Sequence, residues 1–175
     1  MEMWDIYDEN RVKTGRTMAR GQALAPGEKH LVVSVCLFNR KGEMLIQRRH
    51  PDKRDWPGVW DLSAGGSAVA GDDSRTAAER ETFEELGLKL DLSGVRPVLT
   101  VNCEDRFHDY WLIEREVDVE ELTLQPEEVT QARWASREEI LRMVDSGEFI
   151  AFHRGFVDAL FDMRLNGDTI ARNPS

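Results

Sequence analysis

The stretch from Ser74 to Leu86 most constrains what this chain can fold into, because it places carboxylates at a spacing that only a helix makes useful. On a helix, side chains three and four residues apart return to the same face. Glu81, Glu84 and Glu85 would therefore share one patch. Such charges repel one another, and a hard divalent cation, Mg²⁺ or Mn²⁺, is the compensation that suits oxygen ligands best. The alternative is an ordinary solvated helix face.

The other positions of this helix predict its packing and its ends. An apolar flank is expected beside the carboxylates, formed by Ala78, Thr82, Phe83 and Leu86. At the start, Ser74 is a candidate N-cap, and Thr76 with Glu79 is an alternative capping box. Gly87 supplies the left-handed residue that closes the last turn.

A longer pattern surrounds the helix and resembles a known family signature. The chain is similar to the Nudix box, G-x5-E-x7-R-E-U-x-E-E-x-G-U with U an aliphatic residue, matching at Gly66, Arg80, Glu81, Glu84, Glu85, Gly87 and Leu88. Two positions depart, because Asp72 stands where the family has Glu and Thr82 where it has an aliphatic residue. Asp72 is one methylene shorter, which puts the family's loop-stiffening contact in question. Neither departure removes an expected metal ligand.

The resemblance implies a fold and a reaction. Nudix proteins are α/β/α sandwiches around a mixed sheet, with the box forming a loop-helix-loop on it. The family typically hydrolyses a nucleoside diphosphate linked to another moiety, by attack of water at a phosphorus. The resemblance thus implies Mg²⁺ or Mn²⁺ as the cofactor and a small-molecule diphosphate as the substrate. Dimers are common in the family, so a homodimer is one option for assembly.

The same resemblance assigns residue roles at the site. Glu81 and Glu85 are expected to be the principal metal ligands. Glu84 is expected to be a third ligand or the general base. The Gly65 carbonyl, just before the box, is similar to the family's backbone ligand. Arg80 is expected to hold the glutamates in their rotamers.

Cationic side chains outside the box are candidates for binding phosphate. Arg48, Lys53 and Arg54 are assigned to substrate binding, since arginine in particular makes bidentate contacts with phosphate. The alternative for Arg48 is a solvated sheet edge. Glu127 and Glu128 precede the last expected strand, where several Nudix members bring a further acid toward the substrate.

Residues around the box resemble the isopentenyl-diphosphate-isomerase-like branch of the family, at Trp4-Asp5, His30, Asn39, Gly42, Gln47-Arg48-Arg49, Lys53, Pro57-Gly58 and Trp60-Asp61. Isomerases of this branch use a cysteine just after the Trp60 region and bind metal through several histidines. Residues 62–67 contain neither residue type, and only His30 matches an isomerase metal position. A hydrolase is therefore favoured, with an isomerase-like enzyme and a catalytically silent nucleotide-binding domain as the alternatives.

Length and charge narrow the class of protein. The 175 residues suit a single Nudix domain over residues 1–167, with residues 1–29 as an N-terminal arm and 168–175 as a loose tail. The net charge of −10 argues against broad binding to nucleic acid or anionic membrane. Neither a long apolar stretch nor a secretory leader is recognised, so the expected location is cytoplasmic. Cys36 and Cys103 are expected to be buried thiols in strands.

The remaining pattern predicts one mixed α/β domain. The arm is expected to hold a short strand and then a loop. The apolar run His30 to Phe38 is expected to be the central strand, paired in a hairpin with Glu43 to Arg49. Further strands are expected at 58–64, 95–103, 107–117 and 130–135, and further helices at 136–144 and 151–165, the last closed by Gly167.

Overall fold

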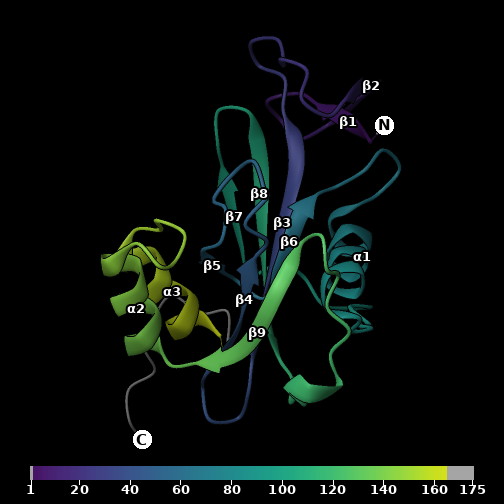
Figure 1. The fold of residues 1–175 in the computed structure, drawn as a ribbon. Helices are drawn as coiled ribbons and strands as arrows, with labels where there is room; N and C mark the ends of the chain where they lie inside the picture. The colour runs from purple at the N-terminus through teal and green to yellow at the C-terminus, as the bar shows by residue number, and fades with distance from the viewer. Residues whose placement is uncertain (1, 165–175) are drawn as a thin grey trace, which may run out of the picture.

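A mixed sheet lies between helices on both of its faces in the computed structural model, which describes residues 2–164 (Figure 1). The sheet has seven strands. They are β3 (His30–Phe38), β4 (Met44–Arg49), β5 (Trp60–Asp61), β6 (Ala64–Ser67), β7 (Leu99–Asn102), β8 (Arg106–Glu114) and β9 (Val129–Ala135). The main path runs β5-β4-β3-β8-β7, with β6 paired to β3 and β9 paired to β4. This arrangement confirms the predicted α/β/α sandwich.

The central strand is β3, as its continuous apolar run predicts. It pairs with β8 in parallel and with β4 and β6 in antiparallel orientation. A strand in this place is covered on both faces, and nearly all of its residues are buried. The predicted hairpin to β4 is confirmed, and its turn uses Gly42 at a φ of +79°.

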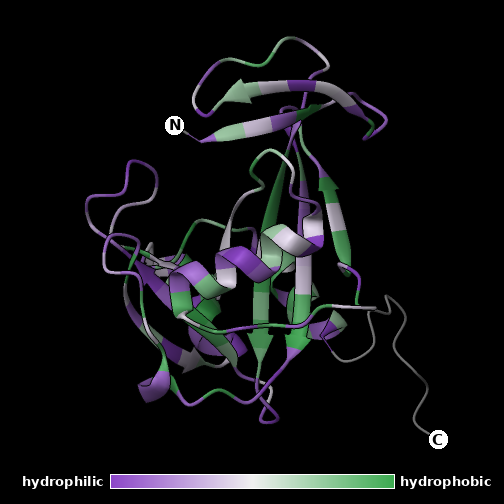
Figure 2. Cartoon of the chain, turned by 90° about the vertical axis from the view of Figure 1, so that its right-hand side faces the viewer, coloured by the Kyte–Doolittle hydropathy of each residue, from purple (hydrophilic) through white to green (hydrophobic). Residues whose placement is uncertain are grey.

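The two faces of the sheet carry different helices. Helix α1 (Ser74–Leu86) covers one face, and Figure 2 shows it crossing in front of hydrophobic strands. Helices α2 (Arg137–Ser146) and α3 (Arg154–Met163) pack on the other face. Each face therefore has its own hydrophobic core.

The helix ends lie where the capping residues predict them, with one correction. Helix α2 begins with the predicted capping box of Ser136 and Glu139 and ends at Gly147. Helix α1 ends at Gly87, which has the predicted left-handed conformation. Its N-cap is Asp73 and not Ser74, because the Asp73 carboxylate accepts the N–H of Thr76 at 2.8 Å.

The flank of α1 is only partly as predicted. Ala78, Thr82 and Leu86 are fully buried, and the Thr82 hydroxyl donates to the Ala78 carbonyl at 2.7 Å. Phe83, in contrast, is 48% exposed, and the Lys89 ammonium lies over its ring. The prediction that Phe83 belongs to the buried flank was wrong, because the buried side of α1 is centred on Ala77 and Ala78.

Within the predicted N-terminal arm 1–29, residues 2–20 form a hairpin and not a single strand followed by a loop, and from here on the arm means residues 2–20. Strands β1 (Met3–Tyr7) and β2 (Lys13–Ala19) pair antiparallel in a separate two-stranded sheet, drawn at the top of Figure 1. The residues of β2 are mostly exposed and show no hydrophobic alternation. Backbone pairing with β1 therefore forms a strand that side-chain patterning does not indicate.

Other elements differ in length from the prediction. Strand β7 is shorter than 95–103, and Pro97, which lacks an N–H, lies before it. The acidic segment before β9 is mostly loop as predicted, with a short 3₁₀ helix η1 (Val119–Glu121). Helix α3 is shorter at both ends than 151–165. Gly167 and the tail 168–175 lie outside the described residues.

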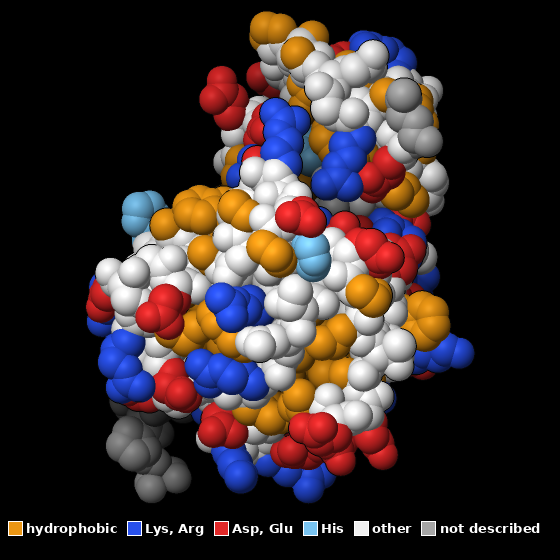
Figure 3. All heavy atoms as spheres, in the orientation of Figure 1, with side chains coloured by type: hydrophobic (Ala, Val, Ile, Leu, Met, Phe, Trp, Pro, Cys, Tyr) orange, Lys and Arg blue, Asp and Glu red, His pale blue; other side chains and the backbone are white. Residues whose placement is uncertain are grey.

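The surface carries charges of both signs, and the two cysteines differ in burial. Lys and Arg side chains are interspersed with Asp and Glu on the face seen in Figure 3. Cys36 is buried in β3 as predicted, whereas Cys103 follows β7 and is only partly buried. Within residues 2–164, no helix has the length and apolar character that crossing a bilayer requires.

Candidate active site

The acidic face of α1 borders a pocket of about 440 Å³. Strand β6, the arm and the loops before β5 and β9 supply the other walls. The pocket brings together most of the predicted site residues, namely Lys53, Gly65, Arg80, Glu81, Glu84 and Glu85. A helix on one side and a short strand on the other thus converge on a single cavity.

Glu85 is held in place from two strands. Its Oε2 accepts a hydrogen bond from the Gln47 side-chain amide at 2.8 Å and another from the Gly65 N–H at 3.1 Å. Glu85 and Gln47 are both buried, with 6% and 2% of their surfaces exposed. Two donors on one oxygen fix the direction of the carboxylate.

Glu81 packs directly against the glycine that opens the box. A Cβ placed on Gly66 would lie 2.5 Å from the Glu81 carboxyl carbon, so a side chain at this position would displace the carboxylate. The other contact of Glu81 is with the Arg80 guanidinium, at 2.9 Å. Burial raises the pKa of Glu81, although Arg80 opposes the shift.

The two buried carboxylates act on each other. Burial raises the pKa of Glu85 to about 8, and the negative charge of Glu81 adds to the shift. Both groups are therefore difficult to ionise together without a compensating positive charge. A divalent cation between them would supply that charge.

Arg80 connects the helix to the loop before it. Its guanidinium donates to Glu81 and Glu84 at 2.9 Å each, and to the Ser67 carbonyl at 3.1 Å. It also donates to Asp72 Oδ2 at 3.1 Å, and the same oxygen accepts the Val69 N–H. The shorter Asp72 thus still contacts the arginine and the loop. Glu84 differs from the other two glutamates, since about half of its side chain is exposed.

The predicted phosphate-binding residues do not all lie at this pocket. Lys53 lines it and forms an ion pair with Glu128, which also lines it. Arg48 points to the opposite face of β4 from its neighbour Gln47, and its Nε donates to the Gly58 carbonyl at 3.0 Å. Arg54 lines a different pocket beside Trp4.

Sequence reasoning missed several residues of the pocket. Glu2 and Arg20 come from the arm, and Gln125 comes from the loop before β9. Gln47, which binds Glu85 without lining the pocket itself, was named only in the run Gln47-Arg48-Arg49 that resembles the isomerase-like branch. No local signal marks these residues, because each reaches the site through strand pairing or a long connection.

The acidic side chains of the pocket are the candidate ligands for a metal ion. Within residues 2–164, no three His, Cys, Asp or Glu side chains form a group that could by itself hold a metal ion. Mg²⁺, however, is usually bound by one or two carboxylates, with waters and substrate phosphates completing the shell. Glu81 and Glu85 are two oxygen donors in one pocket whose charges repel each other. The donor set therefore fits a hard divalent cation bound together with a substrate.

Known proteins are similar to this chain over most of its length. The model of the NUDIX domain matches residues 28–160. A Nudix hydrolase of Listeria monocytogenes is 51% identical over 170 residues, covering 97% of this chain and 99% of the relative. An isopentenyl-diphosphate Delta-isomerase of Streptomyces coelicolor is 32% identical over 162 residues, covering 89% and 81%.

Solved structures show the same fold. A protein of Deinococcus radiodurans has a TM-score of 0.74 at 23% identity, covering 91% of this chain and 99% of that one. The MutT protein of Methanosarcina mazei has a TM-score of 0.57 at 25% identity, covering 78% and 94%. Both similarities extend over most of this chain.

Proposed function

The chain belongs to the Nudix family and is a pyrophosphohydrolase of that family, and we propose that it hydrolyses a nucleoside diphosphate linked to another moiety with the help of Mg²⁺ or Mn²⁺. Water attacks a phosphorus of the diphosphate, the bond from that phosphorus to the bridging oxygen breaks, and the two phosphate-bearing products leave. The observation that carries the proposal is the pair of buried carboxylates, Glu81 and Glu85, in one pocket.

Glu81 and Glu85 are proposed as the principal metal ligands. The bound cation would neutralise the diphosphate charge that otherwise repels a nucleophile. The buried position of both side chains supports this role, since desolvated carboxylates gain most from a cation. Gly65 is proposed to add its carbonyl, and its location on the pocket wall supports that assignment.

Glu84 is proposed as the general base that orients and deprotonates the water. It lines the same pocket but is about half exposed, so solvent water can reach it. Arg80 is a positioning residue here, because it binds Glu81 and Glu84 at the same time. These contacts of Arg80 hold the side chains of Glu84 and Glu81 in fixed positions relative to each other.

Lys53 and Arg20 are proposed to contact the diphosphate. Both line the pocket and both are paired to an acid that also lines it, Glu128 and Glu2 respectively. A substrate phosphate could replace those acids as the partner of each cation. Since Arg48 and Arg54 lie away from the pocket, they are not part of this proposal.

A turnover screen tests the proposal. Nucleoside di- and triphosphates, nucleotide sugars and dinucleotides are incubated with Mg²⁺ or Mn²⁺, and release of phosphate or a nucleoside monophosphate is measured. We expect metal-dependent release from at least one substrate, abolished by Glu85→Gln. Binding of a nucleotide without turnover would instead identify a catalytically silent domain.

An isomerase-like activity is the second candidate, favoured by the 32% identity to an isopentenyl-diphosphate Delta-isomerase. The residues of the site argue against isomerase activity. Residues 62–67 lack cysteine and histidine, and His30 stacks on Trp4 at 4.0 Å, lining another pocket. Isomerisation of isopentenyl diphosphate without hydrolysis would favour this second candidate. A cytoplasmic location stays a prediction from the sequence pattern, and a homodimer stays a prediction of the family resemblance.

A further inference from the structure

The arm lies outside residues 28–160, the part of the chain that the NUDIX domain model matches, yet it forms one wall of the acidic pocket. Glu2 and Arg20, from its two ends, both line that pocket, and the Arg20 guanidinium donates to the Glu2 carboxylate at 2.6 Å. The position of the arm therefore decides the shape of the pocket.

The arm also holds the loop that precedes α1, residues 68–73, which we call the box loop. The Ala70 N–H donates to the Met3 carbonyl at 2.7 Å, and the Gly71 N–H donates to the Asp5 carboxylate at 2.9 Å. The Lys13 ammonium donates to the Asp72 carbonyl at 3.0 Å. Both strands of the arm thus bind the loop that carries the Arg80 partner Asp72.

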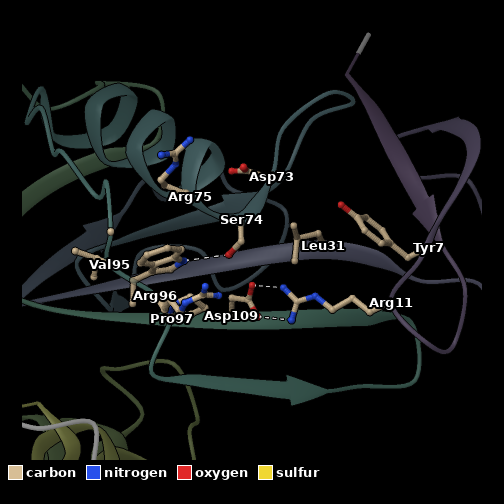
Figure 4. Close-up of a pocket in the computed structure, with 12 residues that line it drawn as sticks. Tyr7, Arg11, Leu31, Asp73, Ser74, Arg75, Val95, Arg96, Pro97 and Asp109 are labelled. Atoms are coloured by element: carbon tan, nitrogen blue, oxygen red, sulfur yellow. Dashed lines mark hydrogen bonds and ion pairs between the residues drawn. The ribbon is translucent and has the colours of Figure 1, made fainter.

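The far end of the arm is held against the rest of the domain by backbone hydrogen bonds between Tyr7 and Lys29 and by one ion pair. Arg11, in the turn between β1 and β2, donates from Nη1 to Asp109 Oδ1 at 2.9 Å and from Nη2 to Oδ2 (Figure 4). Asp109 lies on β8, has no exposed surface, and also accepts from the Thr100 hydroxyl at 2.6 Å. Within residues 2–164, Arg11 is its one ion-pair partner.

This contact is built at a conformational cost. Arg11 has a φ of +63°, in the left-handed region that side chains other than glycine rarely adopt. The turn is held by Asp8, whose carboxylate accepts the N–H groups of Asn10 and Val12 at 2.9 Å each. A buried carboxylate is unfavourable without a partner, so the burial of Asp109 requires Arg11 to stay in place.

We propose that the Arg11–Asp109 pair is a positioning pair that fixes the arm as the substrate-facing wall of the pocket. Neither Arg11 nor Asp109 lines the acidic pocket, so the pair acts through the arm on Arg20 and the box loop. This inference rests on the proposed function for the identity of the substrate. Loss of the pair should therefore weaken substrate binding and leave the metal ligands unchanged.

The test uses Arg11→Met combined with Asp109→Asn, which removes both charges and keeps an acceptor for Thr100. Single removal of Arg11 would leave a buried charge and can prevent folding. We expect KM for the diphosphate substrate to rise about tenfold with kcat nearly unchanged, because a binding contact is lost equally in the ground and transition states. Arg16→Leu is the matched control, since Arg16 is an arm arginine paired to Glu28 outside the pocket.

Two further measurements separate positioning from general destabilisation. Amide hydrogen exchange at Ala70 and Gly71 should become about tenfold faster in the double variant and stay unchanged in the control. In an Arg20→Met background, loss of the pair should add little to KM, because both changes remove the same interaction.

The outcomes decide the two proposals independently. An unchanged KM together with unchanged exchange at Ala70 and Gly71 would overturn the positioning role, as would fully additive effects of the Arg11 and Arg20 changes. If the wild-type protein hydrolyses no diphosphate, the proposed function fails, while exchange at the box loop still decides whether Arg11 and Asp109 fix the arm.

Discussion

The side-chain amide of Gln47 donates a hydrogen bond to Glu85 Oε2 at 2.8 Å, and both residues are buried. The bond joins β4 to α1 beneath the pocket. The Gly65 N–H donates to the same oxygen at 3.1 Å, so the carboxylate has a fixed orientation before any ligand binds. Partners of this kind orient the side chains that bind metals.

We therefore expect Gln47→Leu to weaken binding of Mn²⁺ by about 10- to 100-fold, since outer partners of metal ligands contribute at that scale. The free Mn²⁺ signal in electron paramagnetic resonance measures the affinity directly. Gln131→Leu, at an exposed position on β9, is the control and should leave the affinity unchanged. An equal affinity in both variants would show that Gln47 does not orient Glu85.

The two roles proposed for the glutamates predict different defects. Glu85→Gln should lower Mn²⁺ affinity and reduce turnover by orders of magnitude, because it removes a charged oxygen ligand. Glu84→Gln should reduce kcat by about 10²-fold or more while Mn²⁺ affinity changes little, because a general base is lost. Steady-state kinetics and Mn²⁺ titration of both variants make the comparison. A normal kcat for Glu84→Gln would remove the base assignment.

Variants at Asp72 test whether aspartate, one methylene shorter than glutamate, stabilises the box loop. Asp72→Ala removes the contact to Arg80 and the acceptor for Val69, and should lower the free energy of unfolding by roughly 1.5–3 kcal/mol, the scale of a hydrogen bond to a charged group. Asp72→Glu restores the residue type of the Nudix pattern and should unfold near the wild-type urea midpoint. Equal midpoints for the wild type and Asp72→Ala would contradict a stabilising role.

One buried histidine, His30, and one partly buried histidine, His108, predict a loss of stability in acid. Burial lowers the pKa of His30 and of His108 to about 4, and the rings of both remain neutral in the fold. The unfolded chain binds more protons than the folded one between pH about 6.5 and 4, so stability is lost as the pH falls through that range. Each histidine contributes a slope of up to about 1.4 kcal/mol per pH unit.

His108→Gln should reduce that slope, measured as the free energy of unfolding in urea at pH 4.5, 5.5 and 6.5. Glutamine keeps a polar group near Ser34 and Tyr110, the hydrogen-bond partners of His108. An unchanged pH dependence in this variant would mean that His108 titrates alike in the folded and unfolded chain.

The carboxylate patch could be predicted because helix periodicity is a local property. The spacing of Glu81, Glu84 and Glu85 places them together whatever the rest of the chain does. Their partners could not be predicted in the same way. Gln47 lies 38 residues before Glu85 in the chain and Gly65 lies 20 before it, and only sheet pairing brings them to the helix.

The arm shows a second limit of sequence reasoning. Strand β2 has no hydrophobic alternation, so its existence depends on backbone pairing with β1. The contribution of Arg20 to the pocket follows from that pairing and from the anchoring of Arg11, 98 residues from Asp109. Arg48 shows that sequence reasoning can also place too many residues at a site. Its charge made it a candidate for phosphate binding, but neighbouring residues of a strand point to opposite faces of the sheet, and Arg48 points away from the pocket.

The most direct test of the central claim is an anomalous difference map from a crystal soaked in Mn²⁺ with a non-hydrolysable diphosphate. The account predicts a manganese peak between the Glu81 and Glu85 carboxylates, with diphosphate oxygens completing its coordination. A peak elsewhere in the molecule, or none at full occupancy of the diphosphate, would contradict it.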